Sequence, residues 1–258
     1  MKVKQIAEWL NALAPFDTAE GFDNVGLLMG DPEAEVHTIL FGMDVTDALA
    51  DEAIKLGAEL IITHHPFIFH ALKRIDYSCP QGRTLCRLME KRIAVIGAHT
   101  NWDKAPGGVG DSLAHALQLS DVEAADAYVR VGVLPSPMSV SELHAHIRAC
   151  LHVEPRCFAA VQGPITRIAA AGGAYGEGYM AALAAGAQAF VVGEIAHHEI
   201  LDATARGLTL YDAGHYPTEW PGVIALYERL TADAKEVGWP IQTHLHTQAP
   251  YAGAFLAL

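Results

Sequence analysis

The segment that most constrains the fold runs from Ala58 to His70, where an apolar stretch ends abruptly in His64-His65-Pro66. Residues 58–62 follow the helix-stop residue Gly57 and have the length and apolarity of a short buried strand. Pro66 ends any strand because it has no N–H to donate. The histidine pair therefore lies at a strand's carboxyl end, where open parallel sheets bind ligands. Alone, such a pair fits an ordinary turn equally well, so its meaning depends on the other strand ends.

The residues before this segment predict alternating helices and strands. Apolar residues at helical spacing indicate a helix over 3–13. A turn rich in Gly, Asp and Asn at 21–26 leads into a short strand, and a second strand is expected over 36–43. Thr46 then caps a helix that ends at Gly57.

A second strand end carries the same kinds of side chain. Pro80 opens a helix, and the buried strand that follows, 93–97, ends in Ala98-His99-Thr100-Asn101-Trp102-Asp103. This strand brings an imidazole and a carboxylate to the same edge. The glycine turn at 107–111 opens the next helix and fits either an anion-binding turn or a plain tight turn.

The middle of the chain predicts a separate supporting domain. A strand over 128–134 is followed by Pro135 and Pro137, and a helix is expected over 139–151. Further strands are predicted at 158–161, 168–171 and 190–192, with an Ala-rich helix before the last. The first half of this region holds no cluster of ligand-type residues.

A third strand, 208–211, ends in Asp212-Ala213-Gly214-His215-Tyr216-Pro217-Thr218-Glu219. Pro217 suits the first turn of the long helix that follows. His215 and Glu219 are four residues apart at that helix start, so both side chains can point at one site. A final strand over 241–247 closes the sheet.

Two further histidine pairs have two interpretations each. His197 and His198 begin a helix, and His244 and His246 share one face of the last strand. Either pair could bind a metal or form an ordinary polar surface, and the sequence leaves their role undetermined.

Three strand ends that carry imidazole and carboxylate predict a metal centre. Four nitrogens and two carboxylates are too many for one tetrahedral zinc, so two divalent ions are expected. Paired ions activate a water and stabilise the oxygen that it attacks. Nitrogen and oxygen ligands suit zinc, manganese, iron, cobalt or nickel. The predicted ligands are His64, His65, His99, Asp103, His215 and Glu219.

Composition limits the class of protein. Thirty acidic against 17 basic residues give a formal charge of −13, which makes nucleic acid an unfavourable partner. The first residues lack the apolar segment of a signal peptide, and the most apolar window, 180–193, is shorter than the ~18 residues of a membrane span. We therefore expect a cytoplasmic protein without a membrane anchor. The four cysteines form no C-x-x-C motif and are expected to be buried, reduced thiols.

The motifs at 21–27, 63–66, 98–103, 107–111 and 214–219 together resemble the NIF-three-like family, whose bacterial members are described as GTP cyclohydrolase I type 2 homologs. The resemblance covers essentially the whole chain and matches the short form, without the extra central domain. It implies an α/β fold of two intertwined α/β/α domains with mixed, mainly parallel sheets. We place the metal-ligand-bearing domain at 1–125 plus 211–258 and the second domain at 126–210, with the site at their interface.

The resemblance also implies the metal ligands. It assigns two divalent metals to His64, His65, Asp103, His215 and Glu219, with His99 beside them or among them. Family members commonly carry Asp in the turn after Thr100, where this chain has Asn101, so Asp103 is aligned as the ligand. A ring-shaped homohexamer with its sites facing an interior cavity is also implied.

The predicted function is a dinuclear divalent-metal-dependent hydrolase, a GTP cyclohydrolase I type 2 homolog in which metal-activated water attacks a nucleotide-like small molecule. The alternatives are a non-catalytic metal-binding or interaction protein and a two-metal phosphoesterase. Glu194 or a histidine outside the metal shell could shuttle protons. Basic residues near the site are few, which weakens the case for GTP in particular; they are Lys73, Arg74 and Lys104. Aromatic residues flank the ligands and suit either stacking on a flat heterocycle or core packing; they are Phe67, Phe69, Trp102, Tyr216 and Trp220.

Overall fold

The structure is a computed structural model, and it describes residues 1–161 and 163–248. The chain forms two compact units, one from 1–105 together with 223–248 and the other from 106–222. The first unit is thus built from two segments of chain, with the second unit inserted between them. The predicted division assigns 106–125 and 211–222 to the first domain, whereas both segments pack in the second unit here. Leu113 and Leu117 of the first segment belong to the second unit's core, as do Tyr211 and Ala213 of the second segment.

The first unit contains a five-stranded sheet in which four neighbouring strands are parallel and one edge strand is antiparallel. In spatial order the strands are β1 (Gly26–Met29), β4 (Ala94–Gly97), β3 (Leu60–Thr63), β2 (Thr38–Gly42) and β11 (Gln242–Leu245). The strands β2, β3 and β4 are almost entirely buried, which explains their continuous apolar sequences.

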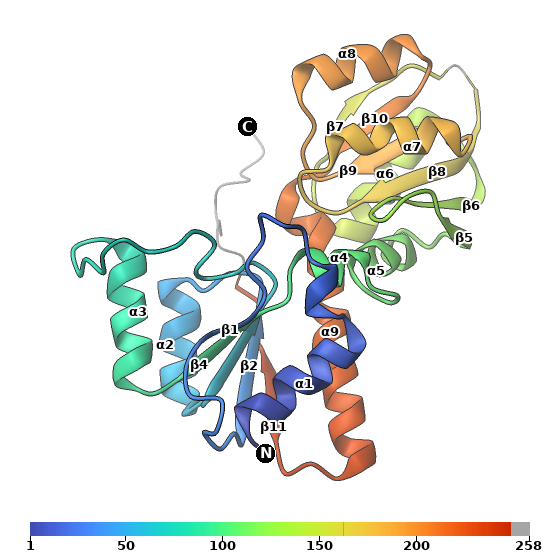
Figure 1. Cartoon of the computed structure of the whole chain (residues 1–258). Helices are drawn as coiled ribbons and strands as arrows, with labels where there is room; N and C mark the ends of the chain where they lie inside the picture. Colours follow the sequence, from blue (N-terminus) through green and yellow to red (C-terminus); the bar gives the residue numbers. More distant parts are fainter. Residues whose placement is uncertain (162, 249–258) are drawn as a thin grey trace. The chain divides into compact units, whose positions relative to one another are not determined.

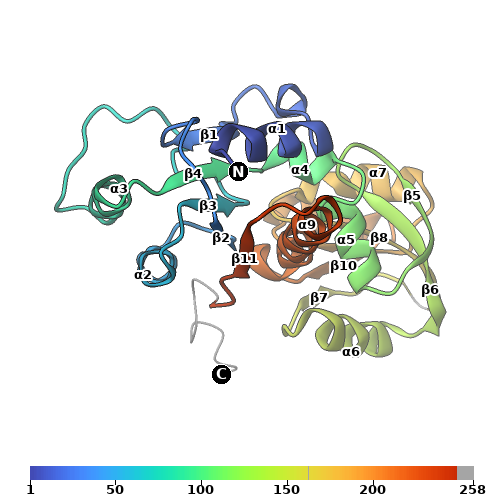
Figure 2. The same ribbon diagram turned by 90° about the horizontal axis from the view of Figure 1, so that it is seen from below.

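Helices cover both faces of this sheet (Figures 1 and 2). They are α1 (Val3–Leu13), α2 (Asp47–Leu56), α3 (Pro80–Glu90), the short α4 (Thr100–Lys104) and the later part of α9 (His215–Val237). On one face, α2 and α3 pack in a core that contains Leu40, Ile61 and Val95. On the other face, Phe41 meets Tyr227 of α9 edge to face, with ring centroids 5.7 Å apart.

Local sequence signals set the ends of the helices that flank the site. The Thr46 hydroxyl accepts a hydrogen bond from the backbone N–H of Leu49, 3.1 Å away, and Gly57 ends α2 in the left-handed conformation. Pro80 is the first residue of α3, after Cys79. The four cysteines are free thiols, but Cys79 is exposed and the others are only half-buried, so the expected burial is wrong.

The second unit contains a six-stranded mixed sheet, of which the central β8, β9 and β10 are parallel. In spatial order the strands are β5 (Ser120–Ala124), β6 (Arg130–Met138), β8 (Ile165–Ala171), β9 (Ala189–Val192), β10 (Thr209–Asp212) and β7 (Arg156–Phe158). Its helices are α5 (Val109–Ala116), α6 (Val140–Leu151), α7 (Tyr179–Ala184) and α8 (His197–Ala205). One apolar core lies under α5 and α6 and another under α7 and α8.

The expected α/β class with two mixed sheets is confirmed, with differences in single elements. The strand β6 continues past Pro135 and Pro137, which fall where its pairing with β8 shifts register between Val133 and Met138. Prolines are tolerated there because an irregular ladder does not need their missing N–H groups. The strand β7 begins at Arg156, two residues before the predicted strand.

Candidate metal centre

Two adjacent parallel strands bring three imidazoles together in the first unit. Thr63 of β3 pairs with Gly97 of β4, so the residues that follow each strand emerge at the same level of the sheet edge. The rings of His64, His65 and His99 have centroids between 5.2 and 5.6 Å apart. One ring nitrogen from each lies within 4.8 Å of the others, close enough for the three to share an ion.

Each of these imidazoles is held through its Nδ1 atom. Nδ1 of His64 lies 2.8 Å from the carbonyl oxygen of Ala98. Nδ1 of His65 lies 2.7 Å from Oδ1 of Asp44, and Nδ1 of His99 lies 2.9 Å from Oδ1 of Asp23. A carbonyl or an ionised carboxylate can only accept, so each Nδ1 carries a hydrogen, and in a neutral ring Nε2 then keeps its lone pair. In this orientation, Nε2 is the ring atom that a metal could bind.

Asp23 is fixed on several sides. Its Oδ2 accepts from the backbone N–H of Thr100, 3.0 Å away, and also from the Thr100 hydroxyl. Burial acts to raise the pKa of the Asp23 carboxyl, but the hydrogen bonds from His99 and Thr100 outweigh it and hold this pKa well below the ordinary value. The carboxylate therefore stays ionised and keeps the hydrogen of His99 on Nδ1.

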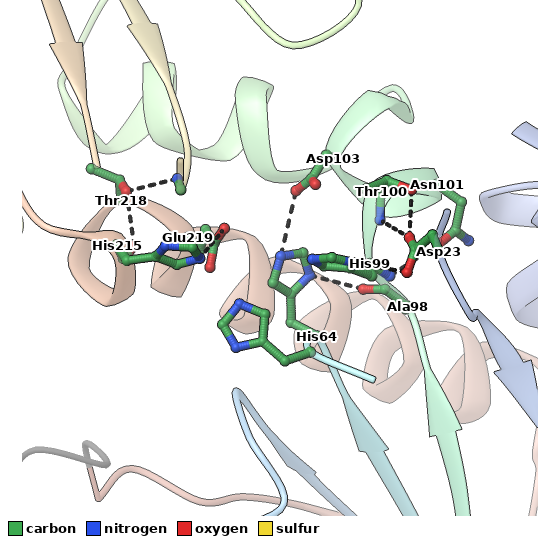
Figure 3. Close-up of polar contacts among 12 residues, drawn as sticks. Asp23, His64, Ala98, His99, Thr100, Asn101, Asp103, His215, Thr218 and Glu219 are labelled. Atoms are coloured by element: carbon green, nitrogen blue, oxygen red, sulfur yellow. Dashed lines mark hydrogen bonds and ion pairs between the residues drawn. The ribbon is translucent and has the colours of Figure 1, made fainter. Parts of the chain in front are cut away.

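The short helix α4 brings a carboxylate to the same place. Oδ1 of Asp103 lies 3.4 Å from Nε2 of His64. A dashed line in Figure 3 marks this contact. Asn101 is used differently, since its side chain donates to the carbonyl of Ala14 and accepts from the backbone N–H of His99. Of these two α4 residues, Asp103 is thus the one directed at an imidazole. We call His64, His65, His99 and Asp103 the first ligand group.

The second unit carries its own pair at the start of α9, which we call the second ligand group. Nε2 of His215 lies 3.1 Å from Oε1 of Glu219, one helical turn away. Nδ1 of His215 lies 2.9 Å from Oε1 of Glu194, so this imidazole has the same tautomer as the other three. His215 and Glu219, which the sequence analysis expects to point at one site, are thus in contact at this helix start.

Gly173, in the turn after β8, makes room for this pair. A Cβ on Gly173 would lie 2.1 Å from Oε1 of Glu219, and the residue has a φ of +61°. The backbone N–H of Gly173 also donates to the Thr218 hydroxyl, 3.1 Å away. Glycine is required here for both its size and its backbone conformation.

The donor spacings suit a divalent ion. Two ligands on adjacent corners of a tetrahedral or octahedral shell with bonds of about 2.1 Å are separated by about 3.0–3.4 Å. The two imidazole–carboxylate distances, 3.4 Å in the first ligand group and 3.1 Å in the second, fall at this separation. The structure therefore contains histidine and carboxylate groups that could hold a metal.

A cavity opens beside His65 in the first unit. Its volume is about 430 Å³, and its lining includes Asp44, Thr46, Phe67 and Gln81. The cavity lies at the starts of α2 and α3 and is lined by His65. Part of a small molecule could therefore approach His65 through it.

Other residues considered in the sequence analysis lie as follows. His197 and His198 are exposed at the start of α8. His246 contacts Glu52 through Nδ1 and lies under α2 rather than among the first ligand group. Lys104 pairs with Glu20, with their charged atoms 2.5 Å apart.

Trp102 is buried, whereas Tyr216 and Trp220 stack with ring centroids 5.2 Å apart. The two carboxylates that contact His65 and His99 are residues of the candidate site that the sequence analysis did not assign. Asp23 lies within a motif quoted for the resemblance, which is a usable signal, but nothing in the sequence marks Asp44. No helix among the described residues is long and apolar enough to cross a bilayer.

Comparison with known proteins shows which family the chain resembles. The family model described as Duf34/NIF3 (NGG1p interacting factor 3) matches residues 1–250. A Clostridium perfringens protein named GTP cyclohydrolase 1 type 2 homolog is 34% identical over 89% of this chain and 91% of its own. A Streptomyces coelicolor protein of the same name is 33% identical, over 95% of this chain and 90% of its own.

The fold is also found among solved structures. A crystal structure of a Staphylococcus aureus protein superposes with a TM-score of 0.93 at 26% identity, covering 100% of this chain and 99% of that one. The match of the family model over almost the whole length, together with relatives above 30% identity, confirms the resemblance drawn from the motifs. The chain belongs to the Duf34/NIF3 family.

Proposed function

We propose that the protein is a hydrolase that depends on two divalent metal ions, held by His64, His65, His99, Asp103, His215 and Glu219. The observation that carries this proposal is the contact that all four histidines make through Nδ1. Each has Nδ1 within 2.9 Å of an oxygen that can only accept, which leaves Nε2 as the coordinating atom. Metal-ligating histidines in proteins are oriented by the same kind of hydrogen bond.

The ligand count supports two ions rather than one. Four imidazoles and two carboxylates exceed a tetrahedral shell, so these residues would hold two ions. We propose that both ligand groups serve this one dinuclear centre. When bound, the pair of ions supplies a nucleophilic water near neutral pH and polarises the electrophile. The chain's own part is to orient the ligands, through Asp23, Asp44 and Glu194.

The substrate that we propose is a nucleotide-like small molecule. The relatives carry the name GTP cyclohydrolase 1 type 2 homolog, which supports attack of water on a nitrogen heterocycle. The charge of −13 and the engagement of Lys104 with Glu20 argue against recognition that depends mainly on a triphosphate. Zinc, manganese, iron, cobalt and nickel are all compatible with these ligands.

Metal content tests the centre itself. Protein purified without chelator is expected to contain two divalent ions per chain, and Asp103→Ala and Glu219→Ala are each expected to lower that number while circular dichroism stays unchanged. Asp51→Ala, which removes a surface partner of Arg87, is the matched control. Two ions retained in both ligand variants would refute this ligand assignment.

A substrate panel tests the chemistry. The metal-loaded protein is incubated with GTP, other nucleotides and phosphodiesters, and the products are read by mass spectrometry. A ring-opened formamide is the expected class of product. Release of phosphate or nucleoside would instead indicate a phosphoesterase, and no metal-dependent turnover of any compound would indicate a non-catalytic metal-binding protein.

The oligomeric state is a separate proposal. By resemblance to the family we propose a homohexamer, which mass photometry of the 27.6 kDa chain distinguishes from smaller assemblies.

A further inference from the structure

Two phenylalanines lie beside the first ligand group. Phe22 is 67% exposed, which is unusual for a large apolar side chain. Its ring meets that of Phe69, with centroids 6.3 Å apart and planes tilted by 55°. The ring of Phe69 in turn meets His99 edge to face at 6.1 Å. The two phenylalanines thus form a continuous aromatic surface that ends at a proposed metal ligand.

We propose that Phe22 and Phe69 form a stacking platform that holds the flat nitrogen heterocycle of the substrate beside His99. The proposal rests on the proposed function and names the part of the substrate that this side of the centre recognises. An aromatic ring accepts any flat heterocycle on its face, because every such ring has a π-surface to stack.

The platform is fixed to the same local frame as the ligand. Phe22 immediately precedes Asp23, whose carboxylate orients His99. Phe69 immediately follows Ile68, whose carbonyl oxygen accepts a hydrogen bond from the Asn24 side chain, 2.5 Å away. The turn at 22–24 therefore contacts the imidazole of His99 through Asp23 and the segment before Phe69 through Asn24. A heterocycle stacked on these rings would have a defined position relative to His99.

Charge favours recognition through the ring. The chain carries a formal charge of −13, and Asp23, Asp44 and Asp103 lie around the imidazoles of the first ligand group. Lys104, the basic residue of α4, contacts Glu20 and the carbonyl oxygen of Thr18. A nucleotide-like substrate that gains little from ion pairs gains its binding energy from stacking, which has no charge requirement.

The test replaces each ring by an aliphatic side chain of similar apolarity. Phe22→Leu and Phe69→Leu are prepared as full-length, metal-loaded protein, with Tyr77→Leu as the control. Tyr77 is 72% exposed in the same unit, without a ring contact to the imidazoles among the described residues. Binding of the four common ribonucleosides and of ribose 5-phosphate is measured by calorimetry, with metal content and oligomeric mass measured on the same samples.

We expect the best-bound nucleoside to lose roughly 5- to 150-fold in affinity in Phe22→Leu and Phe69→Leu, which is the range for removing one stacking contact. Affinity in Tyr77→Leu and ribose 5-phosphate binding in all variants should stay unchanged.

Nucleoside affinity that does not change in either platform variant would overturn the proposal, as would wild-type protein that binds no nucleoside. A smaller oligomer in Phe22→Leu with unchanged nucleoside affinity would overturn it too, by assigning the rings to a contact between copies. If nucleoside affinity is unchanged in the platform variants while two ions remain bound, only the platform is refuted. If the wild-type protein contains no bound metal, the proposed metal centre is refuted.

Discussion

Asp44 allows the link between imidazole orientation and metal affinity to be measured. Its Oδ1 lies 2.7 Å from Nδ1 of His65, and the Asp44 and His65 side chains are 34% and 26% exposed. Removing a carboxylate that orients a ligating histidine typically costs 10- to 100-fold in metal affinity, which is about 1.4–2.7 kcal/mol. Because solvent screens a partly exposed pair, we expect Asp44→Ala to lie near the lower limit, at about 10-fold.

Asp44→Asn separates geometry from charge. An asparagine oxygen can still accept from Nδ1 but lacks the ionic component, which accounts for about half the strength of a charge-assisted hydrogen bond. Its loss of affinity should therefore be about half that of Asp44→Ala on a free-energy scale. Affinity is measured on metal-free protein by competition with a chromophoric chelator, with Asp51→Ala as the control. Wild-type affinity in Asp44→Ala, with the circular dichroism spectrum preserved, would refute the role assigned to this carboxylate.

Three further predictions concern Gly173, Glu59 and removal of the metal ions. Gly173→Ala should lower both thermal stability and metal content, because its Cβ would lie 2.1 Å from Oε1 of Glu219; unchanged metal content would count against the tight packing of that turn. Burial acts to raise the pKa of Glu59, but hydrogen bonds from the backbone N–H groups of Thr38 and His37 outweigh it and lower this pKa. A lowered folded-state pKa contributes stability above the unfolded value of about 4.3 that is lost as pH falls through the folded value. Because the Glu59 side chain is 37% exposed and solvent screens its hydrogen bonds, Glu59→Gln should cost only about 0.5 kcal/mol at pH 7 and progressively less below pH ~4 in urea titrations; an equal cost at both pH values would contradict this. Chelation should lower the melting temperature, since metal at 100 times its Kd stabilises the folded state by about 2.7 kcal/mol, and an unchanged melting curve would mean that the ions do not favour the folded chain.

Much of the fold follows from local signals that the sequence displays. The cap at Thr46 and the stop at Gly57 bound α2 as expected, and the buried strands β3 and β4 match their apolar runs. By contrast, β5 is exposed along its whole length and has no apolar alternation to reveal it. The five-residue α4 is also too short to show helical periodicity.

The candidate site divides in a similar way. Imidazoles at strand ends are visible in the sequence because parallel strands bring their carboxyl ends to one edge. Asp44, which orients His65, is not visible in this way, because the two residues are brought together by adjacent strands rather than by spacing along the chain. Glu194, considered as a proton shuttle from sequence, contacts Nδ1 of His215 through Oε1.

The pairing of β11 with β2 has a consequence for biosynthesis. Residues 242–245 lie about two hundred positions after 38–42, yet they complete the edge of the first sheet. While a ribosome is still translating the inserted unit, β2 has exposed hydrogen-bonding groups along one side and no partner to cover them. The nascent polypeptide thus has an unpaired edge strand through most of its synthesis. Truncated products that stop before residue 242 should be prone to self-association and proteolysis.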